Sequence, residues 1–123
     1  MFEEQEIVTI EKDELLDKVR SIESEDYRLV QISCMKTDNF YVDYTFDKEY
    51  KFYGIRVILP LDQPKLQSIS DIYFAAFIYE NEIHDLFGIK ISGIKVDFKG
   101  KFYRIAKTNP FSSVEVKVIT EKG

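Results

Sequence analysis

The chain has 123 residues, of which 45% are hydrophobic, 15% aromatic and 32% charged, and its formal net charge is −5. This length and composition indicate one folded domain with its own hydrophobic core, and they argue against disorder. The acidic balance excludes the basic surface that proteins use to bind nucleic acid or an anionic membrane.

The N-terminal part of the chain predicts a strand followed by a helix. Ile7 to Ile10 has the composition of a short strand. Lys12 to Ser24 is expected to be helical, because Leu15, Val19 and Ile22 recur at i, i+4 and i+7.

Three strands are predicted next, joined as adjacent hairpins. The expected ranges are Tyr27 to Met35, Phe40 to Phe46 and Tyr50 to Leu59. The second of these alternates apolar and polar residues almost throughout, which is the period-two pattern of an antiparallel strand with one buried face. In the first strand, the residues expected to share one face are Val30, Ile32 and Cys34.

A loop from Pro60 to Ser70 is expected to lead into a second helix. Ser70 or Asp71 can cap this helix, which should run to about Phe87, and Gly88 suits a left-handed terminating residue. At about 100° per residue, one arc of the helix collects the residues expected to face the sheet. They are Ile72, Ala75, Ala76, Tyr79, Ile83, Leu86 and Phe87.

The second helix combines an apolar first half with a dense polar end. The polar residues are Glu80, Asn81, Glu82, His84 and Asp85. In the first half, one sheet cannot cover every apolar side. Phe74, Phe77 and Ile78 are therefore either core residues beneath other segments or an exposed interface, and both interpretations stay open.

Beyond Gly88 the chain contains short strand-like pieces. Val96 to Ile105 is expected to form a small hairpin, and residues 106–123 an extended docking tail that includes a strand-like stretch at 114–119. The whole order predicts an α+β fold of two layers in one domain over residues 1–123. An antiparallel or mixed sheet would carry the helices on one face.

No residue pattern predicts a catalytic, cofactor-binding or metal site. Glu80 and His84 stand at i, i+4 and could share a metal, but His84 is the only histidine and no second ligand motif accompanies it. Glu80 and Glu82 point to nearly opposite sides of a helix, which argues against joint acid–base action. Cys34, the only cysteine, is expected to be a small core residue. A single cysteine also excludes an intrachain disulfide and favours a reducing compartment.

The run FAAFIYENEIHDLFGI, residues 74–89, resembles the signature of the C-subunit family of bacterial NADH dehydrogenase, respiratory complex I. In that signature an aromatic residue and a Glu-Arg-Glu triplet precede an Asp-hydrophobe-aromatic-Gly-Ile ending. The matching positions here are Tyr79, Glu80, Glu82, Asp85, Phe87, Gly88 and Ile89. The order of expected elements from Ile7 to Ile89 is similar to that family as well.

The chain differs from the complex I members at two places. Asn81 stands where they carry arginine, and the part after Gly88 is shorter. In both respects it resembles the small accessory subunit of Ech-type energy-converting nickel–iron hydrogenases. The resemblance implies a cofactor-free subunit that packs against a large nickel–iron subunit and a small iron–sulfur subunit on the cytoplasmic side. The nickel–iron and iron–sulfur centres would belong to those partners, and the assembly would reduce protons with ferredoxin and pump ions.

The polar end of the second helix is the predicted partner interface, because charged pairs at an interface select the partner and its register. The residues expected to take part are Glu80, Asn81, Glu82, Asp85, Phe87 and Gly88. No apolar run reaches the ~18 residues of a membrane span, and the acidic N-terminus lacks the pattern of a signal peptide. The expected location is therefore cytoplasmic, with membrane attachment through partners.

Other interpretations stay open. One is that the chain is the corresponding C-subunit of a complex I-like NADH dehydrogenase. Another is a stand-alone ligand-binding α+β domain, which predicts a pocket with converging polar groups near residues 72–87. Exposed aromatic residues could also make the isolated chain form homo-oligomers.

Overall fold

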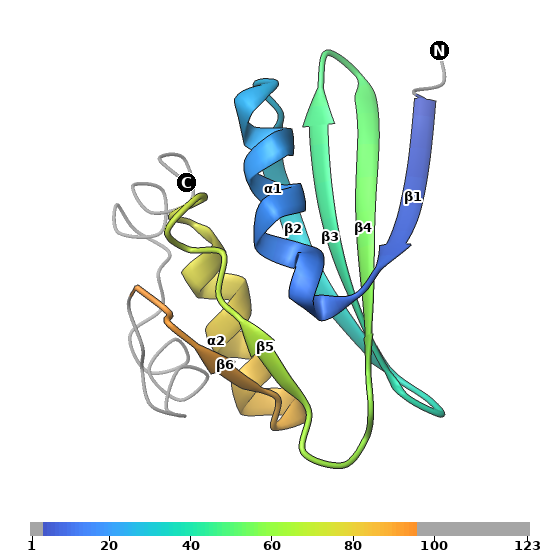
Figure 1. Ribbon diagram of the computed structural model, residues 1–123, viewed down its shortest axis with the longest axis vertical. Helices are drawn as coiled ribbons and strands as arrows, with labels where there is room; N and C mark the ends of the chain where they lie inside the picture. The colour runs from blue at the N-terminus through green and yellow to red at the C-terminus, as the bar shows by residue number, and fades with distance from the viewer. Residues whose placement is uncertain (1–3, 96–123) are drawn as a thin grey trace.

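Four strands form one mixed sheet, and both helices pack on the same face of it (Figure 1). The computed structural model describes residues 4–95. The strands are β1 (Glu4–Ile10), β2 (Arg28–Lys36), β3 (Phe40–Lys48) and β4 (Lys51–Leu59), in the order β1-β4-β3-β2. The last three are antiparallel neighbours, which confirms the predicted meander, and β1 lies parallel to β4.

The first helix and the alternation of the second predicted strand are confirmed. Between β1 and β2 the chain forms a 3-10 turn, η1 (Lys12–Glu14), and then α1 (Leu15–Ser24), whose Leu15, Val19 and Ile22 are all buried. On β3, every second residue from Phe40 to Phe46 is buried. These residues meet in one core between the sheet and the helices, so the two-layer α+β prediction is confirmed.

A β-bulge changes which residues of β2 face the core. The register between β2 and β3 shifts between Leu29 and Gln31, so that one residue of β2 is left over. That residue, Val30, is 36% exposed, whereas Ile32 is buried and Cys34 is half-buried. The prediction that Val30 shares the buried face is therefore wrong, because a bulge resets the alternation.

The predicted loop from residue 60 to residue 70 contains a short strand, β5 (Lys65–Gln67), which pairs in parallel with β6 (Lys90–Ser92). This two-stranded ribbon lies beside α2 (Ala76–Phe87), as Figure 1 shows. The helix therefore has the sheet on one side and the ribbon on another.

Helix α2 begins later than predicted. The chain over residues 70–75 forms turns in which the N–H groups of Ile72 and Tyr73 both donate to the Ile69 carbonyl. Ala75 is the N-cap residue and no side chain caps the helix. Ser70 does not cap it, because the Ser70 hydroxyl bonds to Ser68 and accepts the N–H of Lys95.

The helix ends as predicted, but its buried face is turned. Gly88 has φ +74°, and its N–H donates to the His84 carbonyl. Leu86, which the predicted arc placed against the sheet, is 52% exposed. The ribbon accounts for this difference, because it covers a second side of the helix and shifts the buried arc toward Glu80. The predicted hairpin over 96–105 and the tail over 106–123 lie outside the described residues.

Candidate functional site

Glu80 points into the molecule and is only 1% exposed. Its carboxylate is held by the chain that follows β5. The Ser68 hydroxyl donates to Oε1 at 2.6 Å, and the Ile69 N–H donates to Oε2 at 2.8 Å. Burial raises the pKa of Glu80 to about 7, and the two hydrogen bonds oppose that rise. This corrects the expectation that Glu80 is presented to a partner, since both of its oxygens are engaged inside the chain.

Two serines extend this contact to β6. The hydroxyls of Ser68 and Ser70 are 2.8 Å apart, and Ser70 Oγ accepts the N–H of Lys95 at 2.8 Å. When the Glu80 carboxylate is ionised, the Ser68 hydroxyl donates to it, so Ser70 donates to Ser68 in turn. Each donor in this series of hydrogen bonds then points toward the carboxylate. The series connects α2, the end of β5 and the exit from β6.

Tyr44 of β3 brings a second titratable group into the same interior. It is fully buried, and its hydroxyl has no hydrogen-bond partner in the described part of the chain. Burial and then the negative charge of Glu80 raise the pKa of Tyr44 well above its usual value, so the phenol is neutral. Burial also raises the pKa of Cys34 to about 11, with a smaller effect of Asp43, so the thiol is neutral.

Asn81 is also fully buried, and its Nδ2 donates to the Phe77 carbonyl at 2.7 Å. The expectation that Asn81 lies at an exposed interface is corrected in the same way as for Glu80. The helical wheel missed both residues because it assigns polar side chains to solvent. The nearby signal was the pair of serines at 68 and 70, which can supply donors to a buried carboxylate.

The outward residues at the end of α2 form a smaller set than predicted. Glu82, Asp85 and Phe87 are half-buried and Gly88 is exposed, and we call these four the helix-end surface. Phe87 also supports the fold, because its ring packs edge-on against Phe40 with centroids 6.1 Å apart.

A contact of His84 fixes the path of the chain at the helix-end surface. The ring nitrogen Nδ1 of His84 bonds the Ile89 carbonyl at 2.9 Å and does not bond Glu80. This contact holds the chain just after the helix.

In the first half of α2, Phe77 is core at 2% exposure, whereas Phe74 is 40% exposed. The core interpretation is therefore confirmed for Phe77, and the interface interpretation stays a prediction for Phe74.

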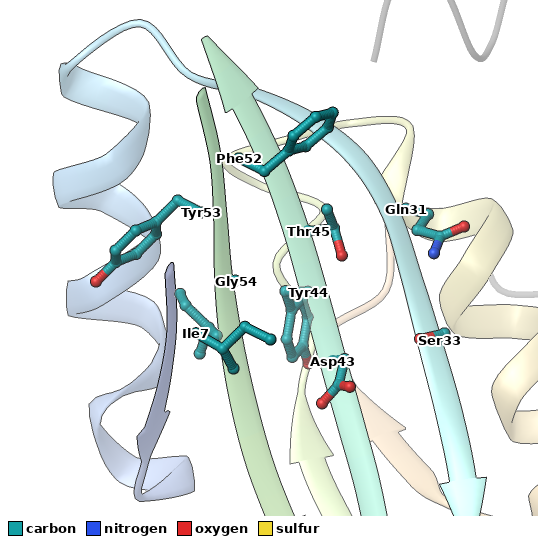
Figure 2. A pocket seen from close by; sticks show the side chains of 10 residues that line it. Ile7, Gln31, Ser33, Asp43, Tyr44, Thr45, Phe52, Tyr53 and Gly54 are labelled. Carbon is teal, nitrogen blue, oxygen red and sulfur yellow. The ribbon is translucent and has the colours of Figure 1, made fainter. Parts of the chain in front are cut away.

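A hollow lies on the face of the sheet opposite the helices (Figure 2). Gly54 lies within it, where an added Cβ would come 3.2 Å from Cγ1 of Ile7. Asp43 is the only carboxylate among its lining residues, and Arg56 holds both Asp43 oxygens at 2.8 and 2.9 Å. The hollow is lined by strand residues and not by α2, so it is not the pocket that a ligand-binding domain predicts near residues 72–87.

Within residues 4–95, no three His, Cys, Asp or Glu side chains gather in a way that could hold a metal ion. The helices of this range are too short and too polar for any of them to cross a membrane.

Comparison with known proteins places these features in a family. The family profile described as respiratory-chain NADH dehydrogenase, 30 Kd subunit, matches residues 8–99. No curated protein matches the chain.

Two solved structures share the fold. The trypsin-resistant fragment of Nqo5 aligns with a TM-score of 0.64 and 20% identity, over 72% of this chain and 79% of that one. A chain of the membrane-bound sulfane sulfur reductase, an archaeal respiratory membrane complex, aligns with a TM-score of 0.69 and 20% identity, over 80% of this chain. The match spans 64% of that longer chain.

Proposed function

This chain belongs to the respiratory-chain NADH dehydrogenase 30 kDa subunit family, and we propose that it is a non-catalytic accessory subunit of a membrane-associated, energy-converting nickel–iron hydrogenase. The family match over residues 8–99 carries the proposal, because it spans both helices and nearly all of the sheet. Membership supports the coarser role of an accessory subunit in a respiratory oxidoreductase.

The choice of a hydrogenase rests on one departure from the complex I pattern within the motif. Asn81 occupies the place of the family's arginine, and it is fully buried with its amide bonded to a helix carbonyl. A buried site of this kind suits a short neutral amide, whereas an arginine there would have to reach solvent or a counter-ion.

In this proposal the chain positions its partners and makes no bonds itself. The nickel–iron and iron–sulfur centres belong to a large and a small partner subunit, where ferredoxin would supply electrons for proton reduction. The helix-end surface of Glu82, Asp85, Phe87 and Gly88 contacts the large subunit. Partner contacts also hold the chain at the cytoplasmic side of the membrane.

Affinity purification of the tagged full chain from its native host tests the proposal. We expect the co-eluting chains to include a large subunit with two paired Cys-x-x-Cys motifs and an iron–sulfur subunit. Recovery of a flavin-bearing NADH module instead would assign the chain to a complex I-like oxidoreductase, which is the alternative. Recovery of no redox subunit at all would contradict both.

A further inference from the structure

The ribbon of β5 and β6 presents two lysines side by side on its outer face. In the parallel register Lys65 lies opposite Lys90, and Leu66 lies opposite Ile91. Leu66 and Ile91 are buried against the molecule, so the residues that alternate with them are exposed. Both ammonium groups therefore leave the ribbon on the same, solvent-facing side.

No carboxylate neutralises this pair in the described part of the chain. The ion pairs found there join Arg20 to Asp17, Arg28 to Asp47, Arg56 to Asp43 and Lys95 to Asp71. Like charges placed directly opposite on neighbouring strands repel each other. The pair is therefore a local positive site, without a counter-ion among residues 4–95, on a chain whose net charge is −5.

A third lysine extends the positive site. Lys12 of η1 lines a hollow of about 170 Å³ beside the ribbon, together with Lys65, Gln67 and Ser92. Asp13 is the single acid among the lining residues, so the hollow and the ribbon together keep a positive balance. Gln67 and Ser92 are neutral and exposed.

We propose that Lys12, Lys65 and Lys90, the ribbon surface, dock an acidic segment of a partner polypeptide. The inference rests on the proposed function, since the partner would be a redox subunit of the same complex. Carboxylates from a partner would relieve the repulsion between the two ribbon lysines and set the orientation of docking. An anionic lipid surface is less favoured, because such surfaces are recognised by clusters of about four to eight basic residues.

The chain offers a matched control in the four-stranded sheet, where β3 turns into β4. Lys48 and Lys51 are also directly opposite, on β3 and β4. Here, however, the Lys48 ammonium lies 5.7 Å from the centre of the Tyr27 ring, which gives it a partner inside the chain. The double variant Lys48→Glu/Lys51→Glu therefore makes the same change of charge away from the ribbon.

The test is recovery of redox subunits by the tagged full chain from its native host. For Lys65→Glu/Lys90→Glu we expect a loss of roughly tenfold or more, while Lys48→Glu/Lys51→Glu stays near wild type. Lys65→Gln/Lys90→Gln, a milder change, should give an intermediate loss, and raising the salt concentration should weaken wild-type recovery. Circular dichroism of each purified variant checks that it is folded.

Recovery at the wild-type level by Lys65→Glu/Lys90→Glu would overturn this inference and leave the proposed function standing. A wild-type chain that recovers no redox subunit would overturn both. Vesicles containing an anionic phospholipid provide the last arm. Binding of wild type to them that the double variant loses, with recovery of redox subunits unchanged, would assign the lysines to lipid and overturn the inference.

Discussion

Glu80 links the folding of this chain to pH. Folding raises its pKa from 4.5 to about 7, because burial disfavours the charged form. Below pH 4.5 the carboxyl is protonated in both states, so the full contribution of this side chain to stability is present. As the pH rises from 4.5 through 7, the unfolded chain ionises first and that contribution is lost. The free energy of unfolding falls by about 3 kcal/mol and then levels off.

Glu80→Gln removes this titration while keeping the shape of the side chain. We expect the difference in free energy of unfolding between variant and wild type to move by about 3 kcal/mol in favour of Gln from pH 4.5 to about pH 8. Urea unfolding at a series of pH values measures it. Glu82→Gln, on the same helix but half-buried, is the control for replacing one glutamate of α2 by glutamine. A curve for Glu80→Gln parallel to that of wild type would mean that ionisation of Glu80 carries no penalty in the folded state.

Residue-level burial was the part of the site that the sequence left undetermined. Periodicity along a helix separates apolar from polar positions, and it assigns the polar ones to solvent. Whether Glu80 turns inward depends on Ser68 and Ile69, which lie 12 and 11 residues away and precede the helix. The pattern within the helix carries no information about those donors.

At the level of elements, length decided what could be predicted. The strands of the meander have nine residues each, and their predicted ends lie within two residues of those observed. Strands β5 and β6 have three residues each, too few to show a period. Residues 65–67 were therefore predicted as part of a loop, and their pairing with the strand-like part beyond Gly88 was not predicted. Because the predicted fold lacked the ribbon, the predicted buried face of α2 was also wrong.

Substitutions of Gly88 test whether α2 ends in a left-handed residue. Its φ of +74° is unfavourable for a residue with a Cβ, yet an added Cβ would meet no atom within 4 Å. Gly88→Ala should therefore lower the free energy of unfolding by about 1 kcal/mol through backbone strain alone. Gly88→Asn should lower it less, since asparagine tolerates this conformation. Thermal or urea unfolding measures both, and an alanine variant as stable as wild type would argue against a left-handed end.

Gly93 provides a contrast, because there the strain is joined by a clash. It has φ +83°, and an added Cβ would lie 2.8 Å from Nε2 of Gln67. That amide also donates to the Ser92 carbonyl across the ribbon. Alanine at 93 should therefore push the end of the exposed Gln67 side chain aside and break this hydrogen bond in addition to the backbone strain, whereas alanine at 88 displaces no side chain.

At the level of the whole molecule, the residues of the motif at 74–89 fall into two groups, one in the polar interior and one at the surface. Glu80 joins α2 to the chain after β5 and Asn81 is buried beside it, while Glu82, Asp85, Phe87 and Gly88 remain at the surface. The resemblance predicted the family because it depends only on the residue types of the motif, and these can be read directly from a single sequence. It could not separate the two roles, because these depend on a contact between distant segments.

Glu82 is the residue of the helix-end surface best suited to a test of docking. It is half-buried and takes no part in the ion pairs of residues 4–95. Its charge raises the pKa of Tyr79, although burial of Tyr79 is the larger cause. Asp85 is less suitable, because one of its oxygens is buried. Glu82→Lys should reduce recovery of the partner subunits from the native host roughly tenfold or more, because a like charge would face a site that selects an acid.

The fold should tolerate this change, with a free energy of unfolding within about 0.5 kcal/mol of wild type, as for most surface substitutions. Glu23→Lys, on the exposed side of α1, makes the same change of charge away from the helix-end surface and should keep full recovery. If Glu82→Lys recovers as much partner as Glu23→Lys does, Glu82 does not contact the partner. Docking would then have to use another surface, and the ribbon lysines would be the next to examine.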